Sequence, residues 1–229
     1  MSRKTDIEAL LKRADTTLKK INSEYDNSLH SKTVSADLRI DIKDYFSNLR
    51  SILDYIAHDI VEKYCPNANP KKLYFPIRAD LNAFLVEMIK SYPDLLTNNK
   101  TVYDILENLQ PFKKDENKWL TFFNKINNEN KHERLVAQTR TETTNVTVNG
   151  PGGGSVSWGS GVTFGSGVSV MGVSIDPNTQ LPIPNNIVKT EIVTWVDFQF
   201  EDINVSAIWL TKESLKQIKK IYNDLKSEI

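Results

Sequence analysis

The sequence predicts an α+β protein: an antiparallel helical bundle of four to five helices plus a C-terminal helix, with an inserted antiparallel β region. Apolar residues recur at helical spacing in the first half of the chain and at its end. In the region between these two parts, apolar and polar residues alternate. All nine glycines lie between Gly150 and Gly172. We therefore expect a helical bundle over 1–137, a Gly/Ser/Val-rich β insertion over 138–210, and a helix over 211–229 that packs on the bundle.

The first two helices are the longest of the bundle. Thr5 to Glu8 has capping-box spacing, and an apolar stripe continues from it to about Asn27. The second helix carries apolar residues at alternating spacings of four and three residues. We expect it to end near Cys65, because a residue that precedes a proline, here Pro66, disfavours helical backbone.

Shorter segments complete the bundle. An apolar segment covers 81–89, and a capped helix begins near Thr101 and ends at 109–112. The last helix of the first half carries Trp119 and continues to Ile126. Its aromatic residues fit a core face, so we expect this helix to close the bundle.

The β insertion contains two well-marked strands. Residues 139–148 are rich in threonine and alternate, and residues 192–201 place Ile192 and Phe198 on one side and Asp197 on the other. The helix that follows carries a single apolar face, formed by Leu215, Ile218, Ile221, Tyr222 and Leu225.

The glycine-rich segment 152–170 matches neither a phosphate-binding loop nor a nucleophile elbow. In an extended chain its apolar residues, among them Trp158 and Phe164, all stand at even positions, and its odd positions are small. Rows of glycine in a strand suggest that another backbone approaches closely. We expect a long hairpin that makes the protein a homo-oligomer through residues 152–170; the alternative is a flexible Gly/Ser linker.

The chain is electrically balanced and contains one cysteine. It has 229 residues, with 29 basic and 29 acidic side chains, so no overall field would attract nucleic acid or an anionic membrane. Cys65 alone excludes an internal disulfide and favours a reducing compartment. No apolar run suits a signal peptide or a membrane span. We expect a cytoplasmic protein that does not bind membranes.

Candidate site residues lie on two helices. Arg50, Asp54 and His58 stand four residues apart, so they line one side of the second helix, nearly opposite its apolar stripe. They form either a solvated row of ion pairs or one wall of a cleft that faces another helix. Asn128, Lys131 and His132 share a face if their helix persists, or they form a polar last turn that complements the helix dipole.

These segments resemble a family of uncharacterised bacterial proteins with the motifs NLRSALD, FPI, LQP(Y/F) and N-x-D-K-H-R. The counterparts here are NLRSILD at 48–54, FPI at 75–77, LQPF at 109–112 and NENKHER at 128–134. Asn130 stands where the motif has aspartate, and Glu133 precedes Arg134. The expected ligand-binding residues are Arg50, Asp54, Asn128, Asn130, Lys131, His132 and Arg134.

The helical half is also similar in outline to HEPN-type bundles, many of which are ribonucleases or antiphage effectors. This resemblance implies metal-independent RNA cleavage, in phage defence or as a toxin. His132 or His58 would act as general base, and Arg50 with Lys131 would stabilise the phosphorane. Four to six residues usually separate the arginine and histidine in that family, whereas seven separate Arg50 from His58.

Two functions of different class follow from the sequence. The first is a non-catalytic binding or interaction protein with a polar pocket for an anionic small molecule or a partner. The second is the ribonuclease, with RNA as its substrate. Overall neutrality favours the first, because nonspecific RNA binding prefers a basic surface. Three histidines and one cysteine offer no metal-binding spacing, so we expect no metal and no cofactor.

Overall fold

The computed structural model describes residues 3–31, 34–69, 73–132 and 135–229. The side chains at 29–31, 130–132 and 195 lie outside this description. The described helices and antiparallel strands confirm the α+β class. The chain divides into a helical unit, residues 1–139 with 199–229, and a β unit, residues 140–198.

The helices are α1 (Arg3–Ser31), α2 (Ala36–Tyr64), α3 (Leu81–Ser91), α4 (Leu95–Asn98), α5 (Lys100–Asn108), the 3-10 helix η2 (Asp115–Asn117), α6 (Lys118–His132) and α7 (Ala207–Leu225). The strands are β1 (Gln138–Asn149), β2 (Ser155–Gly159), β3 (Ser169–Val170), β4 (Val173–Ser174), β5 (Lys189–Phe200) and β6 (Val205–Ser206). Both strands expected from sequence correspond to the longest ones, β1 and β5.

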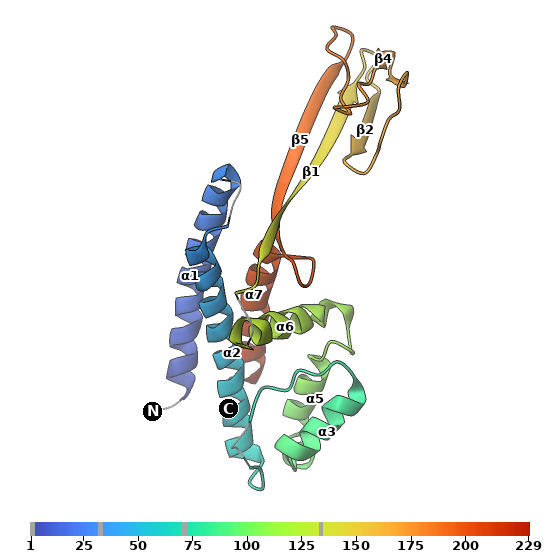
Figure 1. Cartoon of the computed structure of the whole chain (residues 1–229). Coiled ribbons are helices and arrows are strands. Elements are labelled where there is room, and N and C mark those ends of the chain that lie inside the picture. Colours follow the sequence, from blue (N-terminus) through green and yellow to red (C-terminus); the bar gives the residue numbers. More distant parts are fainter. Residues whose placement is uncertain (1–2, 32–33, 70–72, 133–134) are drawn as a thin grey trace. The chain divides into compact units, whose positions relative to one another are not determined.

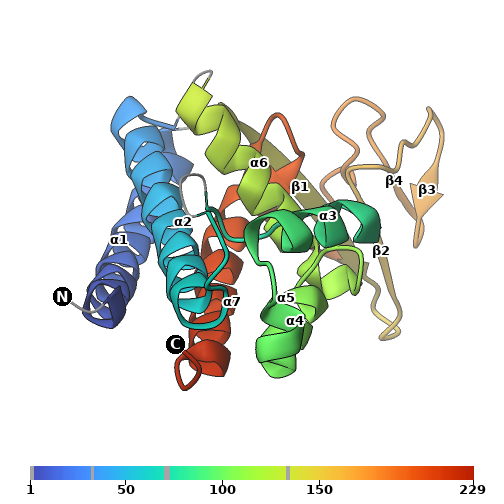
Figure 2. The same ribbon diagram turned by 90° about the horizontal axis from the view of Figure 1, so that it is seen from below.

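The helical unit is built around α2. Helices α1, α2 and α7 lie side by side, and α6 packs on α2 and α7 (Figures 1 and 2). The ring of Phe46 on α2 lies 5.8 Å from that of Phe123 on α6 and 6.1 Å from that of Phe200. The apolar face of α7 is buried, so the last helix packs on the bundle as the sequence predicts.

Capping residues explain where the helices begin and end. The Ser35 side chain accepts the Leu38 N–H at the start of α2, and the Cys65 N–H donates to the Val61 carbonyl at its end. Helix α7 begins at Ala207 and not at Thr211 as expected, because Ser206, five residues before Thr211, is its N-cap. The short α4 was not predicted.

The four-stranded sheet has the order β2-β1-β5-β6, and β3 and β4 form a separate pair. Strand β2 is antiparallel to β1, with Val146 opposite Trp158. One face of these strands carries a small core of four buried residues, Val146, Val148, Trp158 and Ile175. The surrounding chain packs against it through Phe164, Val170, Met171, Leu181 and Val188.

The expected hairpin within 152–170 is wrong in its pairing. Ser155–Gly159 pairs with β1, and the chain after it folds back, with the Phe164 ring 5.1 Å from that of Trp158. A Cβ atom on Gly161 or Gly165 would meet nothing within 4 Å, so no other described part of the chain approaches those glycines closely. Aromatic packing on the small core overrides the extended pattern.

Within the described part of the chain, no helix combines the length and the apolar character that a membrane crossing requires.

Candidate functional site

Arg50 lies at the centre of the polar contacts in the helical unit. Its side chain leaves α2 and is buried, with 8% of the residue exposed. Its Nε donates to Asp54, its Nη1 to Asn124 of α6, and its Nη2 to the Phe75 carbonyl, each at 3.3 Å. The Tyr74 ring lies over the guanidinium, 5.9 Å from its carbon. A single side chain therefore joins α2, α6 and the loop before α3.

Asp54 binds the other backbone group of the same loop residue. Its Oδ1 accepts the Phe75 N–H at 2.9 Å and lies 3.1 Å from the Arg50 guanidinium. The Tyr92 hydroxyl donates to the Tyr74 carbonyl at 2.8 Å. Burial raises the pKa of Tyr92, so this hydroxyl stays protonated and remains a donor. Side chains thus replace the partners that regular secondary structure would supply to this loop.

Gln110 fixes the end of the loop. The residue is fully buried, and its amide nitrogen donates to the carbonyls of Pro76 at 2.9 Å and Leu106 at 2.8 Å. Its amide oxygen accepts the Arg78 N–H at 2.9 Å. Three of the four family-like motifs, at 48–54, 75–77 and 109–112, therefore meet at one place.

A pocket of about 400 Å³ opens beside this loop, and we call it the Arg50 pocket. It is lined by Arg50, Tyr74, Phe75, Ile77, Arg78, Asn124 and Asn128. Two guanidinium groups and two carboxamides thus face it. No carboxylate is among the described lining residues, because Asp54 and Glu87 bind the arginines from outside the lining.

Arg78 forms a 2.5 Å ion pair with Glu87 of α3. Burial opposes the charge on Glu87, but hydrogen bonds from Ser91 and Arg78 and the charges of Arg78 and Lys90 outweigh it. The pKa of Glu87 therefore lies below its ordinary value. Arg78 is the more open of the two arginines, since its side chain is 40% exposed.

The structure separates the expected site residues into three groups. Arg50, Asp54 and Asn128 lie at the pocket or directly behind it, and Arg50 is buried and not part of a solvated row. His58 does not line the pocket; it follows Arg50 by eight residues, roughly 12 Å along the helix axis. Arg134 and the side chains of Asn130, Lys131 and His132 lie outside the described residues.

Sequence reasoning missed Tyr74, Arg78 and Asn124. Asn124 precedes Asn128 by four residues, and this spacing extends the polar face of α6 by one turn. Arg78 follows the FPI motif directly, so it was the nearest cation to a segment already singled out. Both signals were present in the sequence.

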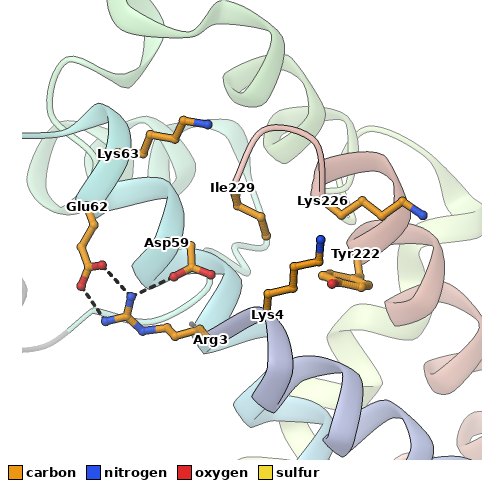
Figure 3. A pocket seen from close by; sticks show the side chains of 8 residues that line it. All are labelled: Arg3, Lys4, Asp59, Glu62, Lys63, Tyr222, Lys226 and Ile229. Carbon is orange, nitrogen blue, oxygen red and sulfur yellow. Dashed lines mark hydrogen bonds and ion pairs between the residues drawn. The ribbon is translucent and has the colours of Figure 1, made fainter. Parts of the chain in front are cut away.

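A second cavity of about 420 Å³ lies where α1, α2 and α7 meet (Figure 3). Its arginine, Arg3, donates to Asp59 at 2.8 Å and to both oxygens of Glu62 at 2.6 Å. The hydrogen bond from Arg3 is the main reason that the pKa of Glu62 is lowered, and His58 adds a smaller effect. Carboxylates line this cavity beside the cations, so it is less suited to an anion than the Arg50 pocket.

No family model, curated protein or solved structure matches this chain. Among the residues that the structure describes, no group of three or more His, Cys, Asp or Glu side chains is placed to hold a metal ion.

Proposed function

We propose that this protein is a non-catalytic binding protein whose Arg50 pocket takes the anionic group of a small molecule or a partner. One observation carries the proposal: two guanidiniums and two carboxamides line the same pocket, and the described carboxylates stay out of its lining. Guanidinium groups recognise carboxylates and phosphates through paired, charge-assisted hydrogen bonds.

The two arginines have different roles in this proposal. Arg50 donates to Asp54, Asn124 and the Phe75 carbonyl, so its guanidinium is held in place and contributes positive charge and few remaining hydrogens. Arg78 donates to the Ile77 carbonyl and to Glu87, which leaves several of its five N–H groups for a ligand. Arg78 is therefore the main ligand donor, and Arg50 is a positioning residue.

RNA cleavage is the alternative that an experiment must separate from binding. A metal-independent ribonuclease needs an imidazole within reach of the reacting phosphate. His58 is not among the residues that line the Arg50 pocket, which favours binding over cleavage. His132 follows Asn128 by one turn on α6, so it is the histidine to test.

The β unit adds self-association to the proposed function. Residues 152–170 were expected to form the contact between copies. The aromatic residues of that segment, Trp158 and Phe164, pack on each other, and Gln180 binds both, through its carbonyl to Trp158 and its side chain to Phe164. Because these side chains stabilise the β unit itself, we expect the contact between copies at another surface of this unit.

The test is titration of the purified protein with inorganic phosphate and pyrophosphate by calorimetry. We expect Arg78→Gln to weaken binding about tenfold, since a hydrogen bond to a charged group contributes about 1.5 kcal/mol. Glu87→Gln is the matched control, because it removes the competing carboxylate and leaves the arginine. It should bind pyrophosphate at least as tightly as the unmodified protein.

Two results would contradict the proposal. If the unmodified protein binds neither anion, the pocket is not an anion site. If total cellular RNA is cleaved in EDTA by the unmodified protein and not by His132→Ala, the ribonuclease replaces the binding protein. Intact RNA with both proteins, together with weaker pyrophosphate binding by Arg78→Gln, would support binding.

A further inference from the structure

Strand β5 has a free edge over most of its length. It lies between β1 and β6, and β6 pairs with it only at Gln199 and Phe200. Among the described strands, none pairs with residues 189–196 on that side. An unpaired edge presents a row of backbone N–H and C=O groups that can bind another strand.

The same part of β5 is exposed on both faces. All residues from Lys189 to Thr194 are exposed, and they include two large apolar side chains, Ile192 at 50% and Val193 at 47%. A two-stranded ribbon is marginally stable in water, and a third strand or a covering layer normally completes it. Apolar β-branched residues on an open edge are the surface that a further strand would cover.

Every second residue of β5 directs its backbone N–H and C=O groups to the open edge. The Glu201 N–H donates to the Ala137 carbonyl at 3.1 Å. The Thr141 hydroxyl donates to the Asp197 carbonyl, and the hydroxyls of Thr144 and Thr194 bond to each other. All three contacts fit the same antiparallel register between β1 and β5. Odd-numbered residues of β5 therefore direct their backbone groups to β1. The even-numbered residues Thr190, Ile192, Thr194 and Val196 direct theirs to the open edge.

We propose that this edge pairs with the same edge of a second copy, antiparallel, around a two-fold axis at Val193. The proposal rests on the self-association included in the proposed function and assigns its location. The open edge of β1 is the less suitable of the two. Its residues 139–144 are threonines with Arg140 and Glu142, which form an ion pair with each other.

Charge complementarity selects the register. With Val193 opposite itself, Lys189 of one copy lies opposite Asp197 of the other, and this pair occurs twice by symmetry. A shift of two residues in one direction sets Glu191 against Asp197, which repel each other. A shift in the opposite direction sets Lys189 against position 195 and Asp197 against position 187, and neither position carries a charged residue. The register at Val193 is the favourable one of the three.

Cysteine cross-linking tests the register directly. In this register two copies of residue 193 form a non-hydrogen-bonded pair with Cα atoms about 4.5 Å apart, within the range of a disulfide. Val193→Cys, in a Cys65→Ser background, should form a covalent dimer under mild oxidation. Glu191→Cys is the matched control, because it is similarly exposed but lies about 13 Å from its copy and should stay monomeric in a denaturing gel.

Charge reversal tests the same register without new cysteines. By sedimentation, Lys189→Asp and Asp197→Lys should each weaken the dimer at least fivefold. The double variant should restore it to within about twofold of the unmodified protein, because it exchanges the two charges of each pair. Local damage by either single change would persist in the double variant, so failure to restore the dimer counts against the proposal.

Light scattering of the unmodified protein separates the possible failures. A monomer at all concentrations would overturn both the self-association and the edge pairing. It would not affect the proposal for the Arg50 pocket, which the anion titration tests separately. A dimer that is lost on deletion of residues 152–170, with no cross-link at 193, would keep the self-association and overturn this register. A cross-link at 193 and not at 191 supports it.

Discussion

The helical unit and the β unit treat their irregular or unpaired backbone in different ways. In the helical unit, the loop before α3 has no secondary structure, yet Asp54, Arg50 and Gln110 bind its backbone groups one by one. In the β unit, the backbone of β5 along its open edge meets no strand of the described chain. The helical unit binds the backbone of this loop with its own side chains. The β unit does so at the Phe198 N–H, which donates to Asp197 Oδ1, and leaves the exposed edge at 189–194 to solvent or to a partner.

This difference indicates where each unit interacts. A loop that is held by buried side chains can position the Arg50 pocket rigidly, as a binding site for a small group requires. An open strand edge offers instead a generic set of backbone groups, and its specificity must come from neighbouring charges such as Lys189 and Asp197.

The largest effect is expected at Gln110. Gln110→Ala leaves the Arg78 N–H and the carbonyls of Pro76 and Leu106 without their partner in a buried site. Unsatisfied buried groups cost about 1 to 3 kcal/mol each, so we expect the free energy of unfolding to fall by about 3 to 5 kcal/mol. Urea unfolding measures it.

Gln217→Ala is the control for this change, because the Gln217 amide donates to the Glu213 side chain on the same helix, a part-buried contact between two side chains of one helix. It should alter the free energy of unfolding by less than about 0.5 kcal/mol. Similar effects of the two substitutions would mean that the loop is not held by Gln110, and the contrast between the units would disappear.

A pair of prolines in β5 sharpens the comparison. Val193→Pro removes an N–H that points to β1, so it should destabilise the β unit by about 3 kcal/mol. Ile192→Pro removes an N–H on the open edge and should cost the monomer much less, while it abolishes the dimer. Hydrogen exchange of the β1 amides and sedimentation measure the two effects. Equal loss of exchange protection in both variants would show that the edge is not open.

Much of the fold follows from local signals in the sequence. The stripe of α2 and its end at Cys65 are set by periodicity and by Pro66, and the face of α7 follows from its spacing. The start of α7 was missed, because Ser206, five residues before the expected start at Thr211, is the N-cap. The hairpin expected within 152–170 is wrong in its pairing, because β2 pairs with β1 and the apolar residues that follow pack on a core that forms only in three dimensions.

Only part of the candidate site was predicted from the sequence, because the rest also depends on contacts that form in three dimensions. Arg50 and Asp54 were identified by their spacing on one helix, and Asn128 by its place in a polar run. Periodicity placed Arg50 opposite the apolar stripe and so suggested exposure, whereas a loop 25 residues away in sequence covers it. No single-helix pattern contains that information, because the contact depends on how the loop returns to α2.

The smallest effect is expected when the pH is lowered, and it tests the ion pair between Glu87 and Arg78 in the helical unit. Hydrogen bonds and nearby cations lower the pKa of Glu87, so its ion pair with Arg78 contributes stability above its unfolded pKa, about 4.3, and loses it as pH falls through the folded value. We expect Glu87→Gln to cost about 0.5 to 1 kcal/mol at pH 7 and progressively less as the pH falls through the folded pKa of Glu87. Urea unfolding over this range measures the difference.

The β unit provides the internal control for the acid experiment. Its cross-strand contacts between Thr147 and Ser157 and between Thr144 and Thr194 join hydroxyl groups, which do not titrate in this range. Amide exchange at Arg78 should therefore accelerate as the pH falls through the folded pKa of Glu87, relative to exchange at Val146 in β1. If the cost of Glu87→Gln does not decrease as the pH is lowered below the ordinary pKa of a glutamate, the carboxylate does not hold Arg78 by charge. The wall of the Arg50 pocket would then depend on the Gln110 contact alone.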